Sequence, residues 1–305
     1  MSLKSHLETR ETLELVARSS WQFGRRDVIA SGMAWYDAHP EEAAIVGRNL
    51  EHMGLDSSPA ALRRSLEGIV THYFEKFFVM TKGFEAHWIV EKRVEVGGAL
   101  APLERARREG RAVFLGQSHF GGTYLLVPIL ITHGFDVTFI GLFPGRVFEM
   151  LKANIDAYSS RWKTGRATLV NIADADAPVP EIMMGAFASG EIVMNVFDEN
   201  NALSRPVRLL GRTLHGGSGM DRILSRYSED RVSVLAPFAV RTSTDSFRLE
   251  MDRLSLSSKD IVQDLFDSLG RRIAAASDQW YFIQELHHSL GPAGPRPPAG
   301  RPPGG

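Results

Sequence analysis

The stretch Arg111-Ala-Val-Phe-Leu-Gly-Gln-Ser-His119-Phe-Gly-Gly-Thr-Tyr124 places a histidine and two glycines directly after an apolar run. The run predicts a buried strand, and the second apolar run, 125–131, predicts a helix after a Gly-rich turn. A histidine at the carboxyl end of a strand is held by a rigid element, and its glycine neighbours let the backbone approach a substrate closely. Because imidazole exchanges a proton near neutral pH, His119 is a candidate general base. The competing interpretation is a packed structural histidine, which is the commoner role beside an apolar run.

Alternating strand and helix patterns continue along the chain from this stretch. The expected strands are 93–97, 135–141, 168–172, 191–197, 232–240 and 246–254, and the expected helices are 99–109, 148–159, 180–188 and 261–276. The first ninety residues show helical spacing instead, as in Leu66, Val70, Tyr73 and Phe77 after Pro59. The pattern predicts an α/β fold with a mixed central sheet flanked by helices and a helical N-terminal portion. Residues 291–305 are almost entirely Pro, Gly, Ala and Arg, which predicts a disordered tail.

The composition excludes several functional classes. The chain has 305 residues, a formal net charge of −1 and no cysteine, so disulfides, thiolate nucleophiles and zinc–thiolate sites are excluded. Near-zero net charge provides no electrostatic basis for binding nucleic acid. Residues 1–26 lack the apolar core of a signal peptide, and no stretch approaches the roughly 20 apolar residues of a spanning helix. We therefore expect a cytoplasmic protein.

Five blocks of sequence, in this order, resemble the lipid A (lauroyl/myristoyl) acyltransferase family of the lysophospholipid acyltransferase superfamily. They are Arg48-Asn49-Leu50; Val94-Glu-Val-Gly-Gly; the strand into His119-Phe-Gly-Gly; Ala236-Pro-Phe-Ala-Val-Arg241 with Phe247-Arg-Leu-Glu-Met-Asp; and Asp278-Gln279-Trp280-Tyr-Phe-Ile. The resemblance covers nearly the whole folded chain and implies one acyltransferase-like domain over 1–290, with a helical part at 1–90 and an α/β core at 91–290. It implies transfer of an acyl group from an acyl-carrier-protein or coenzyme A thioester to a hydroxyl.

The family signature is a histidine followed five positions later by Asp or Glu, and the present sequence has Tyr124 at that fifth position. In the family the acid orients the histidine ring and stabilises the imidazolium. A phenol can hydrogen-bond an imidazole but carries no full charge near neutral pH, since its reference pKa is about 10. Three interpretations remain open: Tyr124 orients the ring well enough for a reactive acceptor such as an amine, another carboxylate replaces the missing acid, or catalysis has been lost.

The best substitute carboxylates are Asp198 and Glu199, which follow the strand expected at 191–197. That strand points toward the same rim of the sheet as His119, and the resemblance implies an acidic motif at the acceptor site. The alternative is an ordinary strand-end turn, where Asp and Asn are favoured.

Other candidate binding groups lie elsewhere in the chain. The backbone of Gly121 and Gly122 is a candidate to stabilise the thioester oxyanion. Arg146, on a turn beside a strand end, is a candidate phosphate-binding residue, although a solvated helix face is the alternative. Ser218, in a Gly-rich loop that precedes an expected helix running to Tyr227, is a candidate rim residue that binds an anion or carbonyl oxygen. No metal-ligand pattern is present in the sequence, and no tightly bound cofactor is expected.

Together these features predict an acyltransferase with His119 as base, Tyr124 as ring partner, and Asp198 or Glu199 as the source of negative charge. The acceptor is a small molecule or a lipid, and a lipid acceptor implies peripheral contact with the inner face of a membrane. The alternative function is a non-catalytic acyl- or lipid-binding protein that keeps the fold.

Overall fold

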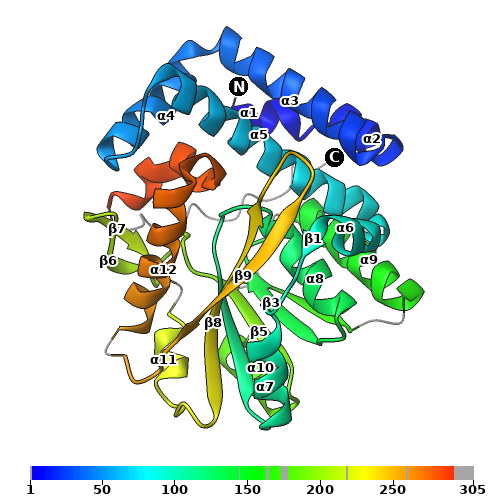
Figure 1. The fold of residues 1–305 in the computed structure, drawn as a ribbon, viewed down its shortest axis with the longest axis vertical. Coiled ribbons are helices and arrows are strands. Elements are labelled where there is room, and N and C mark those ends of the chain that lie inside the picture. The colour runs from blue at the N-terminus through cyan, green and yellow to red at the C-terminus, as the bar shows by residue number, and fades with distance from the viewer. Residues whose placement is uncertain are drawn as a thin grey trace, which may run out of the picture.

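A computed structural model describes residues 2–143, 145–162, 165–172, 178–217, 219–258 and 260–291 (Figure 1). The tail expected to be disordered lies outside this range from residue 292 onward. The N-terminal portion consists of helices α1 (Leu3–Leu7), α2 (Arg10–Arg18), α3 (Trp21–Ala38), α4 (Pro40–His52), α5 (Pro59–Lys82) and α6 (Ala86–Arg93). The helical character expected for the first ninety residues is confirmed.

Local sequence signals set where these helices begin. The side chains of Ser20 and Ser58 accept hydrogen bonds from the backbone N–H groups of Phe23 and Ala61, so α3 and α5 have N-caps. Pro40 occupies the first position of α4, where a missing N–H costs nothing. The long helix α5 is buried almost all round over its second half, which explains its aromatic-rich sequence.

The core is a seven-stranded mixed sheet in the order β1-β9-β8-β2-β5-β3-β4. Its strands are β1 (Val94–Glu95), β2 (Ala112–Gln117), β3 (Val137–Gly141), β4 (Ala167–Asn171), β5 (Ile192–Val196), β8 (Val232–Arg241) and β9 (Phe247–Leu254). All neighbours are parallel except β8 and β9, which form an antiparallel pair. The α/β class with a mixed central sheet flanked by helices is therefore confirmed.

Helices connect and cover the strands. They are α7 (Ala101–Arg108), α8 (Leu126–Thr132), α9 (Gly145–Trp162), α10 (Val179–Ala188), α11 (Asp221–Leu224) and α12 (Ile261–Ala275). The chain moves outward from β2 to β3 and β4 and then returns to β5, so right-handed crossovers place α8 and α9 on one face and α10 on the other. Short 3-10 helices at Ser277–Gln279 and Tyr281–Ser289 close the described chain.

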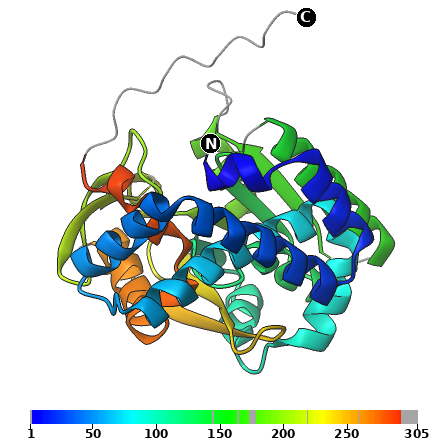
Figure 2. The same cartoon turned by 90° about the horizontal axis from the view of Figure 1, so that it is seen from above.

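The helical N-terminal portion lies over one end of the sheet, as Figures 1 and 2 show from two directions. Helix α5 contacts α9, the 3-10 turn at Thr123–Leu125 and both closing 3-10 helices. It therefore forms one wall of the region where β2 ends in His119.

One element was missed in the sequence, and two were predicted too long, one of them the strand expected at 93–97, which is only Val94–Glu95. Strands β6 (Arg205–Leu209) and β7 (Arg212–Gly216) form a separate antiparallel hairpin. The turn of the hairpin has Leu210 and Gly211 at positive φ. Each strand has only two buried positions, so the alternation of apolar and polar residues is too short to identify a strand from the sequence. The helix expected to run to Tyr227 is only the four-residue α11.

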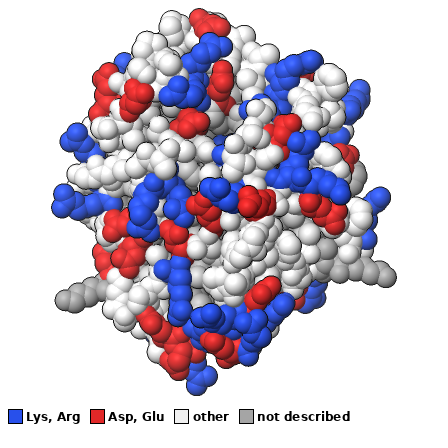
Figure 3. Space-filling view, viewed as in Figure 1, with Lys and Arg blue, Asp and Glu red and all other residues white. Residues whose placement is uncertain are grey.

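The surface carries charges of both signs. On the face viewed in Figure 1, Lys and Arg side chains are interspersed with Asp and Glu across all layers of the fold (Figure 3). None of the helices that the structure describes combines the length and apolarity needed to cross a bilayer.

Candidate active site

The strand pair β2–β5 brings His119 and Asp198 together. These strands are parallel neighbours with Gln117 opposite Val196, so the residues that follow them emerge at the same edge of the sheet. The Asp198 carboxylate accepts two hydrogen bonds from His119, one from ring Nδ1 at 2.9 Å and one from the backbone N–H at 2.8 Å. Asp198 is only 4 % exposed, so it is a buried carboxylate whose two oxygens both contact the same histidine. This arrangement holds the ring and leaves Nε2 for chemistry.

Glu199 lies on the other side of the ring. Its carboxylate oxygen Oε1 is 3.6 Å from His119 Nε2, and its side chain is 31 % exposed. Burial raises the pKa of Glu199, with His119 opposing that rise and Asp198 and Glu285 adding to it. A second carboxylate therefore faces the free ring nitrogen, where a proton-donating substrate group would lie.

The two carboxylates control the protonation of His119. Burial by itself lowers the pKa of the imidazole, but the adjacent Asp198 charge and hydrogen bond, helped by Glu199, raise it to about 9. The ring is thus held as imidazolium near neutral pH and becomes a base as the pH rises toward 9.

Tyr124 is not the ring partner of His119. Within the described chain no hydrogen bond joins the two side chains, and the partner of Nδ1 is Asp198. Tyr124 instead lies beside His72, with ring centroids 5.0 Å apart, and lines the same cavity. Burial raises the pKa of its hydroxyl, so Tyr124 is a neutral phenol. The hydrogen-bond partner of the His119 ring is therefore the carboxylate of Asp198, which follows β5.

The backbone N–H groups of Gly121 and Gly122 are already engaged. The Gly121 N–H donates to the Gln279 carbonyl at 2.9 Å, and the Gly122 N–H donates to the Ala239 carbonyl at 2.7 Å. Gly121 has φ of +62°, and a Cβ there would lie 2.3 Å from the Ala239 oxygen, so close packing requires a glycine. The expectation that these two amides stabilise an oxyanion is therefore wrong for this arrangement.

An ion pair holds the glycine turn in place. The Arg241 guanidinium donates to the Gly121 carbonyl at 2.9 Å and makes two bonds of 2.7 Å to Glu75 on α5. The Glu75 side chain is fully buried and that of Arg241 is 11 % exposed. The pair therefore fastens α5 to the strand end that carries His119.

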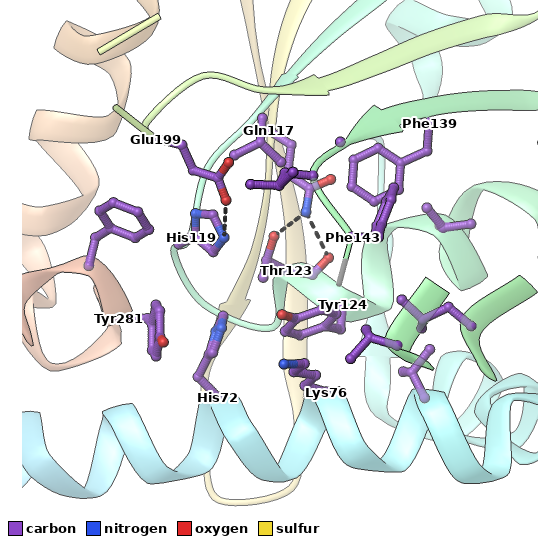
Figure 4. Close-up of a pocket in the computed structure, with 18 of the residues that line it drawn as sticks. His72, Lys76, Gln117, His119, Thr123, Tyr124, Phe139, Phe143, Glu199 and Tyr281 are labelled. Carbon is purple, nitrogen blue, oxygen red and sulfur yellow. Dashed lines mark hydrogen bonds and ion pairs between the residues drawn. The ribbon is translucent and has the colours of Figure 1, made fainter. Parts of the chain in front are cut away.

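His119 opens onto a cavity of about 390 Å³, a size typical of small-molecule sites. One side of it is apolar, lined by Val127, Phe139, Val147, Leu151, Ile155 and Leu169 from α8, β3, α9 and β4. The other side is polar and includes His119, Glu199 and Tyr281, with Gln117, Thr123 and Tyr124 between the two sides (Figure 4). A ligand with a long apolar group and a polar reacting centre fits this division.

The sequence of the Phe-rich run 73–84 allowed an acyl-binding wall as the alternative to core, and α5 does line the cavity, but the polar residues of α5 and of the last described turn were missed. His72 and Lys76 of α5, and Glu285 of the closing 3-10 helix, line the cavity. One signal was present: His72 and Lys76 are four residues apart in an otherwise apolar helical run, so they share a helix face. Lys76 is paired with Glu8.

Neither a protein-family model nor a curated protein matches the chain. The chemistry of the site is therefore the basis for assigning a function.

Two of the predicted binding residues fall outside what the structure describes. Arg146 belongs to α9, but its side chain lies outside the described part of the structure, and the whole of Ser218 does too.

Gln279 and Trp280 have structural contacts. Both side-chain amide atoms of Gln279 hydrogen-bond the backbone of Arg241, and Trp280 is buried and pairs with Phe120. Over the residues that the structure describes, no group of three or more His, Asp or Glu side chains is arranged to hold a metal ion.

Proposed function

We propose that the protein is an acyltransferase that moves an acyl group from an acyl-carrier-protein or coenzyme A thioester to a hydroxyl or amine acceptor. The observation that carries this proposal is the His119–Asp198 dyad, whose histidine lies on the polar side of a cavity that has an apolar side opposite. The apolar side accommodates the acyl chain, and the dyad faces the reacting carbonyl. No tightly bound cofactor is required for this reaction.

Unprotonated His119 removes the proton from the acceptor through Nε2, and the acceptor oxygen or nitrogen attacks the thioester carbonyl carbon. Collapse of the tetrahedral intermediate breaks the C–S bond, and the proton on His119 passes to the departing thiolate. Asp198 keeps the proton on Nδ1 and stabilises the imidazolium that forms between these steps. Glu199, near Nε2, positions the acceptor by accepting a hydrogen bond from a second O–H or N–H of the acceptor, one that does not react.

The proposed fold family is the lysophospholipid acyltransferase superfamily. The sheet that ends in His119, the antiparallel β8–β9 pair and the closing Gln279-Trp280 segment support this assignment together with the sequence blocks. The difference is the source of the acid, which comes from the end of β5 instead of five residues after the histidine. We propose a cytoplasmic location, with contact to the inner membrane face if the acceptor is a lipid.

The test is thiol release from a panel of acyl-carrier-protein and coenzyme A thioesters, with hydroxyl and amine acceptors present. We expect release by the wild type, loss of release in His119→Ala, and unchanged release in the control His133→Ala, which alters an exposed histidine. Measurable acyl-ligand binding without release by the wild type under any condition would refute the catalytic proposal and favour a non-catalytic acyl-binding protein.

A further inference from the structure

The described part of the chain holds one cavity-lining histidine that the reaction above does not use. His72 is 2 % exposed and lines the cavity from helix α5. Among the described residues neither of its ring nitrogens has a hydrogen-bond partner, and Nδ1 is fully buried. The buried Nδ1 cannot reach a substrate, so the ring nitrogen available to the cavity is Nε2, which in the Nε2–H tautomer is an uncommitted hydrogen-bond donor.

The surroundings of His72 fix its ring against the reacting centre. It stacks on Tyr281 with ring centroids 3.9 Å apart and an interplanar angle of 16°. Tyr281 is itself held by hydrogen bonds to Tyr73 at 2.9 Å and to Glu285 at 3.0 Å. The ring extends from α5 toward the space between His119 and Tyr124, with the His72 and His119 centroids 5.8 Å apart (Figure 4).

His72 is a neutral imidazole. Burial lowers its pKa well below the ordinary value of 6.5, and the positive charges of His119, Arg241 and Lys76 lower it further. In its neutral form an imidazole has one N–H donor and one acceptor nitrogen. Such a ring can polarise a carbonyl without carrying a charge, as the neutral histidine of triosephosphate isomerase does.

The proposed reaction requires a donor for the oxyanion, and several of the groups near His119 are already committed; among the described residues the Tyr124 hydroxyl is another cavity-lining donor without a hydrogen-bond partner. The amides of Gly121 and Gly122 bind carbonyl groups of the protein, and the Lys76 ammonium is paired with Glu8. The Tyr281 hydroxyl already bonds to both Tyr73 and Glu285. His72 lies at the same end of the cavity as His119 and has no such commitment.

We infer that His72 is a catalytic residue whose ring N–H donates a hydrogen bond to the thioester carbonyl oxygen as that oxygen becomes an oxyanion. This inference rests on the proposed acyltransferase function. It adds a group from the N-terminal helical portion to a site otherwise built from the α/β core. The carbonyl oxygen would lie in the cavity beside Nε2 of His72, and the acceptor beside Nε2 of His119.

The kinetic test compares His72→Phe, which keeps an aromatic ring against Tyr281 but has no donor, with His72→Gln, which keeps an amide donor. Loss of one oxyanion donor lowers kcat by about 10²–10³-fold, so we expect that fall in His72→Phe with little change in KM for the thioester. His72→Gln should recover part of the loss. Equal kcat in wild type and His72→Phe would overturn the inference. Equal losses of kcat in His72→Phe and His72→Gln, with a raised KM in both, would indicate a structural role and would also overturn it.

A spectroscopic test does not depend on turnover. In a His119→Gln background, an acyl-coenzyme A thioester labelled with ¹³C at its carbonyl should show a lower carbonyl stretching frequency when bound than in the His119→Gln/His72→Phe double variant. Identical frequencies would overturn the inference. Wild-type turnover dependent on His119 but indifferent to His72 would refute this inference alone, whereas absence of wild-type turnover would refute the proposed function.

Discussion

Replacing Asp198 with Asn should disable the dyad while leaving its shape almost unchanged. Both carboxylate oxygens accept hydrogen bonds from His119, one from the ring and one from the backbone. Asn offers one acceptor and one donor, so the backbone bond can be kept only if the amide N–H₂ faces ring Nδ1. That contact favours the tautomer with the proton on Nε2, which cannot accept a proton from substrate.

The magnitude follows from the protonation of the ring. The pKa of His119 is raised from 6.5 to about 9, and one pKa unit corresponds to about 1.4 kcal/mol, so the folded protein stabilises the imidazolium by about 3 kcal/mol. Because burial opposes this effect, the carboxylates supply more than that net amount. The equivalent change in a serine-protease triad lowers the rate by about 10⁴-fold, and we expect a loss of that order in Asp198→Asn.

The assay is the pH dependence of kcat/KM for thiol release. Wild-type kcat/KM should rise with pH through an apparent pKa of about 9, as His119 loses its proton. In Asp198→Asn the maximum should fall and the midpoint should move to lower pH. The control is Asp156→Asn, whose side chain is 56 % exposed in a surface pair with Lys152 and should leave both features unchanged. A variant with wild-type kcat/KM and an alkaline midpoint would refute the role given to Asp198.

Three further predictions concern stability and the acyl side of the cavity. The raised pKa of His119 stabilises the folded state below the unfolded value of 6.5, and that stabilisation is lost as the pH rises through about 9. The difference in free energy of unfolding between wild type and His119→Gln, measured by urea titration, should therefore shrink by about 3 kcal/mol between those limits. A difference that stays constant with pH would contradict the shift. Leu151→Trp should fill the apolar side and abolish turnover of long acyl thioesters before short ones, measured on a chain-length series; uniform loss at every length would argue against an acyl chain there. Arg241→Ala should lower the free energy of unfolding by about 3–5 kcal/mol by leaving buried Glu75 unpaired, and the double variant Arg241→Met/Glu75→Leu should lose much less in the same titration.

Much of the site could be anticipated from strand positions. Parallel strands present their carboxyl ends at one edge, so a histidine after β2 and acidic residues after β5 were expected at one rim before their contact was known. The sequence does not state which residue would hold the ring, because Tyr124 is close to His119 along the chain whereas Asp198 approaches it only through strand pairing.

The sequence by itself determined the α/β class, the helical N-terminal portion and the placement of His119, because each depends on local periodicity or on a strand end. Tertiary structure alone decided three features of the site. The N–H groups of Gly121 and Gly122 donate to backbone carbonyl groups of Gln279 and Ala239. The order of the strands brings Asp198 to the His119 ring, and helix α5 brings buried His72 into the cavity wall. Each of these depends on contacts between segments far apart in the chain, and the local pattern shows only that His72 and Lys76 share one face of α5.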